Sequence, residues 1–244
     1  RQEFVVYYQP KIDVKQGRVA GMEALVRWRD PERGLIPPGE FIPVAEESGL
    51  IEAIGQWVLE ETCAQNKRWQ QEGLPAVRAS VNVSARQFRN PRFVGLVEQV
   101  LEQTGLEPRW LELEITESML MGDIETIVTR MEDLRKVGVS LSIDDFGTGY
   151  SSLSYLSRFP ITTLKIDRAF IADVQTNPQT AEITRAIIGL SRGLDLEVVA
   201  EGAEVVEQIE FLQTHGCELV QGFYYSRPLP AEEFAKMLRD GPAV

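Results

Sequence analysis

Apolar, β-branched runs and helical patterns alternate along most of the chain. Runs rich in valine, isoleucine and leucine predict eight strands, at residues 4–9, 19–27, 77–83, 111–115, 139–143, 163–166, 197–200 and 219–223. Amphipathic stretches of helical period, several of which end at glycine, predict helices at residues 51–71, 93–105, 124–138, 181–193 and 205–216. Regular alternation of strand and helix is typical of parallel βα units. We therefore expect an α/β protein.

Eight strands with helices between them favour closure into a TIM-like (β/α)8 barrel over an open sheet. The first connection is the exception, because only the segment PKIDVKQGR separates the first two strands. A parallel crossover needs a dozen or more residues and usually a helix. We therefore expect the first strand to run antiparallel to the others.

Length and composition agree with one barrel. The 244 residues are 43% hydrophobic, which is ample for one large core. No apolar run approaches the roughly 18 residues of a membrane span, so we expect no membrane contact by this module. The chain starts at Arg1 and a strand pattern begins at Phe4, so residues 1–244 are expected to be a single domain of a longer multidomain protein.

Cysteine usage and net charge limit the cellular compartment and the classes of binding partner that we expect. Cys63 and Cys217 lack metal-ligand spacing, which favours structural thiols in a reducing cytoplasm. A net charge of −12 argues against binding of bulk nucleic acid, which needs an excess of basic side chains. An acidic protein can still bind a small phosphate-bearing molecule when divalent cations lie between the two sets of negative charge.

Polar residues recur where the predicted strands end. In barrels of this type the chemistry lies at the carboxyl ends of the strands, where such side chains converge. The residues at these ends are Glu23, Asn82, Glu114 with Glu117, Asp144 with Asp145, Lys165 with Asp167, Glu201 with Glu204, and Gln221. Each of them alone is more often a solvated or capping group than a ligand. Together their carboxylates would repel one another unless neutralised, and hard oxygen donors of this kind suit Mg²⁺ or Mn²⁺.

The residue inventory excludes several other chemistries. The chain has one histidine, His215, whose place before Gly216 predicts a partner of a helix C-terminus rather than a catalyst. Ser-His-Asp and histidine-rich zinc sites are therefore excluded. The tripeptide DFG at 145–147 lacks the glycine-rich and His-Arg-Asp loops of a protein kinase. Gly147 and Gly149 instead predict backbone freedom in a loop that moves on ligand binding.

Nine ordered motifs resemble the EAL family of cyclic di-GMP phosphodiesterases, over almost the whole chain. The family tripeptide stands here as Glu23-Ala24-Leu25. The motifs are YYQP at 7–10, EALVRW at 23–28, PPGEFIPVAEESGLI at 37–51, VNVSARQF at 81–88, LELEITES at 111–118, IDDFGTGYSSLSYL at 143–156, LKIDRAFI at 164–171, VVAEGAE at 198–204 and QGFYYSRPL at 221–229.

The resemblance implies a role for each matching residue. Those that match the ligands of a first metal ion are Glu23, Asn82, Glu114 and Asp144. Asp144 also matches a bridge to a second ion, which Asp145 would hold as well. Glu201 matches the general base that activates water, and Lys165 matches the lysine near that water and the phosphate. The positions that match substrate-binding or ligand-facing residues are Gln9, Leu25, Arg27, Glu204 and Gln221. Glu117 matches the residue that anchors the loop after the aspartates.

The implied reaction is metal-dependent hydrolysis of cyclic di-GMP to linear pGpG with two Mg²⁺ or Mn²⁺ ions, while Ca²⁺ would occupy the site without supporting turnover. The resemblance also implies an upstream sensory or GGDEF domain, with which the full-length protein could be membrane-anchored. A homodimer through residues 150–159 is a further expectation of the resemblance. Its apolar side chains, Leu153, Tyr155 and Leu156, could equally belong to the core.

Two other functions compete with the enzyme. A catalytically silent receptor would bind cyclic di-GMP without hydrolysis, although the retained ligands and Glu201 favour the enzyme. A pure scaffold would not explain the acidic cluster. The chain departs from the family pattern at Lys11, where an apolar residue is usual, and at Ala203, where valine is frequent. Neither departure is expected to contact a proposed ligand.

Overall fold

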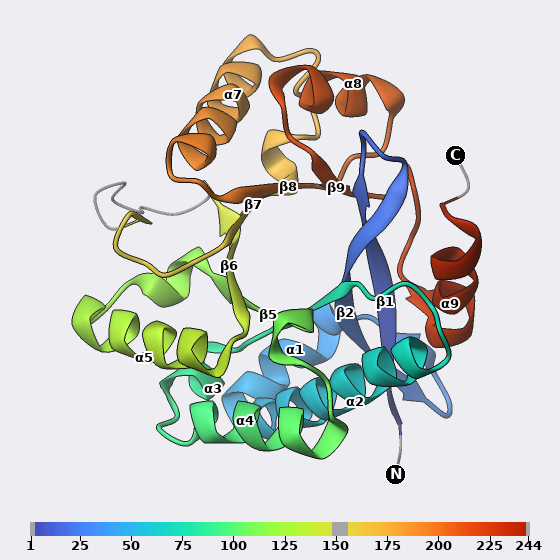
Figure 1. Ribbon diagram of the computed structural model, residues 1–244, viewed down its shortest axis with the longest axis vertical. Helices are drawn as coiled ribbons and strands as arrows, with labels where there is room; N and C mark the ends of the chain where they lie inside the picture. Colours follow the sequence, from blue (N-terminus) through green and yellow to red (C-terminus); the bar gives the residue numbers. More distant parts are fainter. Residues whose placement is uncertain (1–2, 148–155, 243–244) are drawn as a thin grey trace.

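The computed structural model describes residues 3–147 and 156–242 and forms a closed barrel (Figure 1). Ten strands make one sheet, and pairing of β1 with β2 closes it into a ring, with the short β3 and β10 added outside. The ring therefore has eight strands. Its strands are β1 (Phe4–Asp13), β2 (Arg18–Asp30), β4 (Arg78–Asn82), β5 (Leu111–Thr116), β6 (Ser140–Phe146), β7 (Thr163–Ile166), β8 (Glu197–Glu201) and β9 (Leu219–Gln221).

The expected strand directions are confirmed. Within the ring, neighbouring strands from β2 through β9 pair in parallel, whereas β1 pairs antiparallel with both β2 and β9. The short β1–β2 connection forces this arrangement, since it has no room for a crossover helix. The two long strands form the twisted hairpin that completes the ring in Figure 1.

Helices surround the ring and bury their apolar faces against it (Figure 1). Helix α4, for example, buries Phe93, Val97 and Val100 at helical spacing and ends at Gly105 in the left-handed conformation. The helices are α1 (Pro38–Ser48), α2 (Ile51–Gln71), α3 (Ala85–Arg89), α4 (Phe93–Thr104), α5 (Ile124–Val137), α7 (Pro178–Gly193), α8 (Val206–His215) and α9 (Ala231–Asp240). Short 3-10 turns are η1 (Pro108–Trp110), η2 (Glu117–Leu120) and η3 (Arg168–Phe170).

Boundaries differ most from the sequence predictions where pairing extends or stops a strand. The hairpin partners carry β1 on to Asp13, and β9 ends at Gln221 rather than at residue 223. The additional strands β3 (Gly34–Ile36) and β10 (Leu229–Pro230) are too short to give a strand pattern of their own, and they exist by pairing with β2 and β1. The helices α1, α3 and α9 were likewise not among the predicted helices.

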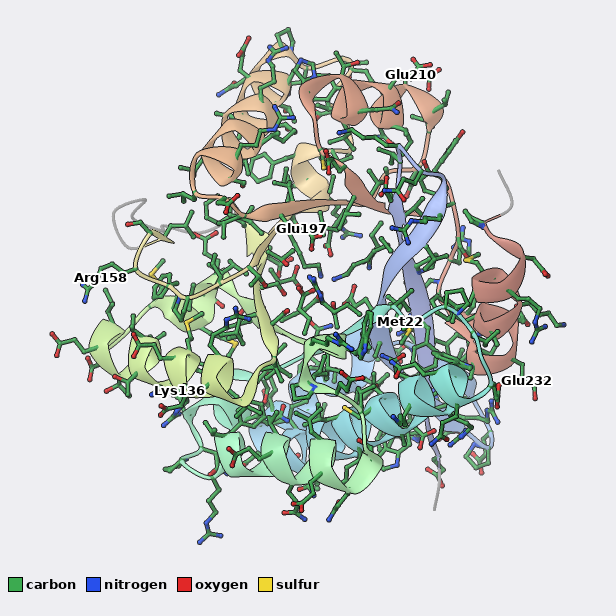
Figure 2. All side chains as sticks on the ribbon, viewed as in Figure 1. Met22, Lys136, Arg158, Glu197, Glu210 and Glu232 are labelled. Carbon is green, nitrogen blue, oxygen red and sulfur yellow. The ribbon has the colours of Figure 1, made fainter. Side chains whose placement is uncertain are left out.

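The inside of the ring is polar, in contrast to the branched apolar layers that fill most such barrels. Figure 2 shows oxygen and nitrogen atoms of side chains gathered within the ring, whereas Lys136, Glu210 and Glu232 project outward from the helices. The apolar core lies instead between strands and helices. The site described below therefore occupies a charged interior within an apolar shell.

Several smaller expectations can be compared with the described residues. Cys63 and Cys217 are free and buried, and His215 ends α8 with Nδ1 2.7 Å from the carbonyl oxygen of Phe211, as expected of a helix-terminal residue. Within the described residues, no helix combines the length and apolar character needed to cross a bilayer. Leu156 is buried in the core, while Gly149, Leu153 and Tyr155 lie outside the described residues. The homodimer remains a prediction.

Candidate functional site

The predicted site residues converge at the carboxyl-terminal mouth of the ring. Alternation along each strand turns every second side chain inward, so residues far apart in sequence meet there. The contributors are Gln9 on β1, Glu23 on β2, Asn82 on β4, Glu114 on β5, Asp144 and Asp145 on β6, Lys165 on β7, Glu201 on β8 and Gln221 on β9.

Lys165 is the centre of the cluster. Its Nζ lies 2.6 Å from Glu114 Oε2, 2.5 Å from Glu201 Oε1, 3.0 Å from Asp144 Oδ1 and 3.6 Å from Glu23 Oε2, and the residue is 1% exposed. Burial opposes its charge, but Glu114 and Glu201 nevertheless raise the pKa of Lys165 well above its ordinary value. A single ammonium thus bridges four carboxylates.

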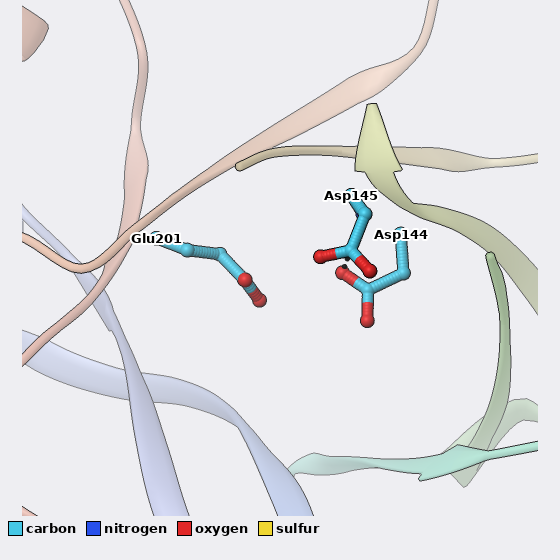
Figure 3. A group of neighbouring side chains, drawn as sticks. All are labelled: Asp144, Asp145 and Glu201. Carbon is cyan, nitrogen blue, oxygen red and sulfur yellow. Dashed lines mark hydrogen bonds between the residues drawn. The ribbon is translucent and has the colours of Figure 1, made fainter. Parts of the chain in front are cut away.

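Three carboxylates are close enough to share a cation. Ligand oxygens of Asp144, Asp145 and Glu201 lie within 4.8 Å of one another. Figure 3 shows Glu201 reaching from its strand toward the two aspartates. Asp145 has φ 55°, and its amide donates to Asp144 Oδ1 at 3.0 Å. This left-handed backbone aims both adjacent side chains at the same space, which regular strand alternation would not do.

Two acids of this group, Asp145 and Glu201, have raised pKa values. Burial, reinforced by the charges of Asp144 and Asp167, raises the pKa of Asp145 to about 6. Burial also raises the pKa of Glu201 to about 8, against the opposing effect of Lys165 and together with nearby carboxylates. Such shifts are typical of functional sites in which negative charges are gathered for a cation or a reaction.

The donor set fits a divalent cation. Glu201 Oε1 is buried and forms no hydrogen bond with a described residue, although Lys165 Nζ lies 2.5 Å away. Gln221 Oε1 is also buried and has no hydrogen-bond partner among the described residues. Asn82 Nδ2 donates to Glu23 Oε1 at 2.6 Å. Carboxylate and amide oxygens are the ligands that Mg²⁺ and Mn²⁺ prefer. The cluster can therefore hold a divalent ion.

A pocket of about 500 Å³ opens beside the cluster. Its walls include the predicted residues Gln9, Glu23, Leu25, Glu201, Glu204 and Gln221. Gln221 Nε2 donates to Gln9 Oε1 at 3.2 Å and also to Glu23, so these polar residues form one network. Arg168 and Phe223 also line the pocket, although sequence reasoning did not single them out.

Arg27 does not line this pocket in the structure. Its Nη1 donates to the Val26 carbonyl at 2.9 Å, and its guanidinium lies 5.8 Å from the centre of the Tyr7 ring. The substrate-binding role of Arg27 therefore remains a prediction.

Glu117 reaches the segment after the aspartates. It is 2% exposed, and its Oε2 accepts a hydrogen bond from the Gly147 amide at 2.9 Å. Gly147 has φ +99°, and a Cβ there would lie 2.7 Å from the Phe170 ring. The contact is the one expected of a loop anchor, while its effect on activity remains a prediction.

The expectation that Lys11 contacts no proposed ligand is wrong. Lys11 Nζ lies 2.8 Å from Glu114 Oε1 and 3.0 Å from Glu112 Oε1, and the residue is 4% exposed. The error arose because Lys11 falls in an apolar strand pattern, which says nothing about a polar barrel interior. The alternation of Gln9 and Lys11 on one strand face was the available signal.

Fold and site together define the class: a (β/α)8-type barrel protein with an antiparallel first strand and an oxygen-donor site for a divalent cation at its mouth. The family model described as the EAL domain matches residues 1–228. The chain belongs to the EAL domain family.

Similar proteins agree with this assignment. The chain is 47% identical over 233 residues to the bifunctional diguanylate cyclase/cyclic di-GMP phosphodiesterase MucR of Pseudomonas aeruginosa, covering 96% of this chain and 34% of MucR. It is 45% identical over 240 residues to the signaling protein YkoW of Bacillus subtilis, covering 98% of this chain and 30% of YkoW. A solved structure of the PaMucR phosphodiesterase in complex with c-di-GMP matches with a TM-score of 0.93 and 47% identity, covering 96% of this chain and 95% of that one. MucR and YkoW are longer proteins, and the chain spans about a third of the length of each.

Proposed function

We propose that this chain hydrolyses one phosphodiester bond of cyclic di-GMP to give linear pGpG. The observation that carries the proposal is the convergence of Glu23, Glu114, Asp144 and Glu201 on Lys165 beside an open pocket. MucR is named a cyclic di-GMP phosphodiesterase, and its close structural similarity over the same barrel supports the choice of substrate.

Two divalent ions, Mg²⁺ or Mn²⁺, belong to this proposal. Glu23, Asn82, Glu114 and Asp144 would hold the first ion, and Asp144 and Asp145 would hold the second. Bound in this way, the ions would activate water and neutralise the non-bridging phosphate oxygens. Ca²⁺ is expected to bind the same donors without supporting turnover.

Glu201 and Lys165 would perform the acid–base and electrostatic work. Glu201 lies in the acidic cluster and lines the pocket, so it can accept a proton from water attacking a bound phosphate. Positioned bases of this kind contribute about 10²- to 10⁴-fold in rate. Lys165 contacts Asp144 and Glu201 at the mouth, which supports a role for its ammonium in stabilising negative charge that develops on the phosphate.

The pocket residues would orient the dinucleotide. Gln9, Leu25, Glu204 and Gln221 line the space next to Glu201 and are the proposed substrate contacts. Arg27 would join them by turning its guanidinium away from the Val26 carbonyl toward a phosphate.

The decisive experiment incubates the protein with cyclic di-GMP and Mn²⁺ and measures pGpG by chromatography. We expect turnover, its loss on addition of EDTA, and no turnover when Ca²⁺ replaces Mn²⁺. Glu201→Ala should retain nucleotide binding and lose turnover; wild-type pGpG release from this variant would refute the base assignment. Binding without any turnover by the wild type would support the catalytically silent receptor instead.

The remaining proposals concern the setting of the module. The relatives are much longer than this chain, which supports an upstream sensory or GGDEF domain in the full-length protein. We also propose a cytoplasmic location, because the free, buried thiols of Cys63 and Cys217 suit a reducing compartment, and a homodimer through residues 150–159. Light scattering of the purified module tests the last of these.

A further inference from the structure

Lys11 lies in the middle of the barrel, beneath the mouth. Gln9 and Lys11 lie two residues apart on one face of β1, and both are buried. Gln9 lines the pocket at the mouth, whereas Asp13 lines a separate pocket that also contains the first residue of β8, Glu197, at the opposite end of the ring. Lys11 therefore sits one step below the residues of the proposed active site.

The strand pairing makes room for this lysine. Lys11 is the register partner of Gly21 on β2. A Cβ on Gly21 would lie 3.6 Å from Lys11 Cδ, so any longer side chain there would compete with the lysine stem for space. With glycine at that position, the stem stays inside the ring and delivers its ammonium to Ser80 Oγ at 2.6 Å and to the two glutamates of β5.

Glu114 is held from both sides by ammonium groups. Lys11 Nζ contacts Oε1 at 2.8 Å, and Lys165 Nζ contacts Oε2 at 2.6 Å. Lys165 also contacts Glu201, Asp144 and Glu23 at the mouth. Among the described residues, the Lys11 ammonium instead contacts Ser80 and the two β5 glutamates. An incoming cation would therefore compete with Lys165 for several carboxylates at the mouth, but with Lys11 for Glu114 alone.

We propose that Lys11 is a positioning residue for the metal site, holding one oxygen of the Glu114 carboxylate so that the other oxygen faces the mouth. The inference rests on the proposed metal-dependent function. Removing Lys11 leaves Glu114 with one ammonium, that of Lys165. Glu114 then shares this ammonium with Glu23, Asp144 and Glu201. Groups that orient metal ligands in this way typically change metal affinity by about 10- to 100-fold.

A purely structural role predicts something different. Lys11 also neutralises Glu112, which is 2% exposed, and losing it would leave a buried charge. That effect lowers the stability of the fold but does not change the Mn²⁺ affinity of the molecules that remain folded. Arg78 supplies the matched control, since its Nη1 lies 3.3 Å from Glu112 Oε2 and 2.9 Å from Glu197 Oε2 without contacting Glu114.

The test measures Mn²⁺ affinity by calorimetry in wild type, Lys11→Met, Lys11→Arg, Arg78→Met and the double variant Lys11→Met/Glu112→Gln. The double variant removes the uncompensated glutamate and keeps the test valid if Lys11→Met alone does not fold. We expect affinity to fall by about 10- to 100-fold in both Lys11→Met variants, to recover in part in Lys11→Arg, and to stay within about threefold in Arg78→Met. The Mn²⁺ concentration for half-maximal pGpG release should rise by the same factor.

The outcomes separate this inference from the proposed activity. Wild-type Mn²⁺ affinity in the folded double variant, with wild type hydrolysing cyclic di-GMP, overturns the role of Lys11 alone. A wild type that binds Mn²⁺ in a Lys11-dependent way but releases no pGpG supports the positioning role and refutes the hydrolase. A wild type that binds no Mn²⁺ overturns both.

Discussion

Replacing Lys165 by methionine should destabilise the metal-free protein far more than an ordinary lysine substitution does. The ammonium is 1% exposed and has Glu114, Glu201 and Asp144 within 3.0 Å. Methionine preserves most of the stem volume, so the variant removes the charge and little packing. The carboxylates are then left buried beside one another without their shared cation.

The expected loss can be bounded from these contacts. Removing one partner of a buried ion pair costs about 3–5 kcal/mol, because the other charge stays buried and unpaired. For a chain of this length, each kcal/mol lowers Tm by about 2–4 °C, so the expected decrease is about 6–20 °C. Lys136→Met is the control: this lysine contacts Asp133 at 2.7 Å on the surface, its side chain is 73% exposed, and such pairs contribute at most about 1 kcal/mol.

Thermal unfolding in EDTA, followed by circular dichroism, measures the difference between the two variants. Adding Mn²⁺ should narrow it, because divalent cations supply part of the missing positive charge. A Tm for Lys165→Met within about 2 °C of the Lys136→Met control in EDTA would refute the reasoning. It would show that the stability of the fold does not depend on the ion pairs of Lys165 with Glu114, Asp144 and Glu201.

Three further predictions address individual residues. Asp144→Asn removes a carboxylate proposed to touch both ions and should weaken Mn²⁺ binding in both steps of a titration; an unchanged isotherm would contradict the bridge. Glu117→Ala deletes the acceptor of the Gly147 amide and should speed hydrogen exchange of that amide by at least about tenfold, the equivalent of about 1.4 kcal/mol. Wild-type protection of the amide would show that Glu117 does not anchor this segment. Glu201 has a pKa raised from 4.5 to about 8, so the folded state binds the extra proton and stability falls as pH rises between these values. Glu201→Gln should therefore raise the Tm of the metal-free protein above pH 8 relative to wild type and have little effect below pH 4.5; equal Tm values at pH 9 would refute this.

Strand ends were the most informative feature of the sequence. Parallel βα units bring the carboxyl ends of their strands to one face, so Glu114 and Glu201 could be placed together from their positions alone. The antiparallel first strand also followed from connection length. These features depend on local pattern and chain geometry, which sequence records directly.

Features that depend on rotamers or on tertiary neighbours were not predictable. The positive φ of Asp145 aims two adjacent carboxylates at one space, although strand alternation alone would separate them. Arg27 folds back on its own backbone, which no sequence pattern indicates. Lys11 was noted only as a departure from the family pattern, because its partners on β4 and β5 lie about 70 to 100 residues away in the chain.

The charge balance inside the ring connects these features. Glu23, Glu112, Glu114 and Asp144 are all buried, and Glu201 and Asp145 are partly so, whereas the fully buried cations of the described interior are Lys11 and Lys165. Lys11 forms ion pairs with Glu112 and Glu114, so most of the uncompensated negative charge lies at the mouth. Burying unpaired carboxylates is costly, and protonation of Asp145 and Glu201 near neutral pH is one way to relieve that cost. Binding of divalent cations would be the other, and in the proposed mechanism it would leave Glu201 ionised and able to act as a base. The same excess of acid that destabilises the metal-free barrel therefore favours cations at the mouth, where they would attract an anionic phosphodiester to a protein of net charge −12.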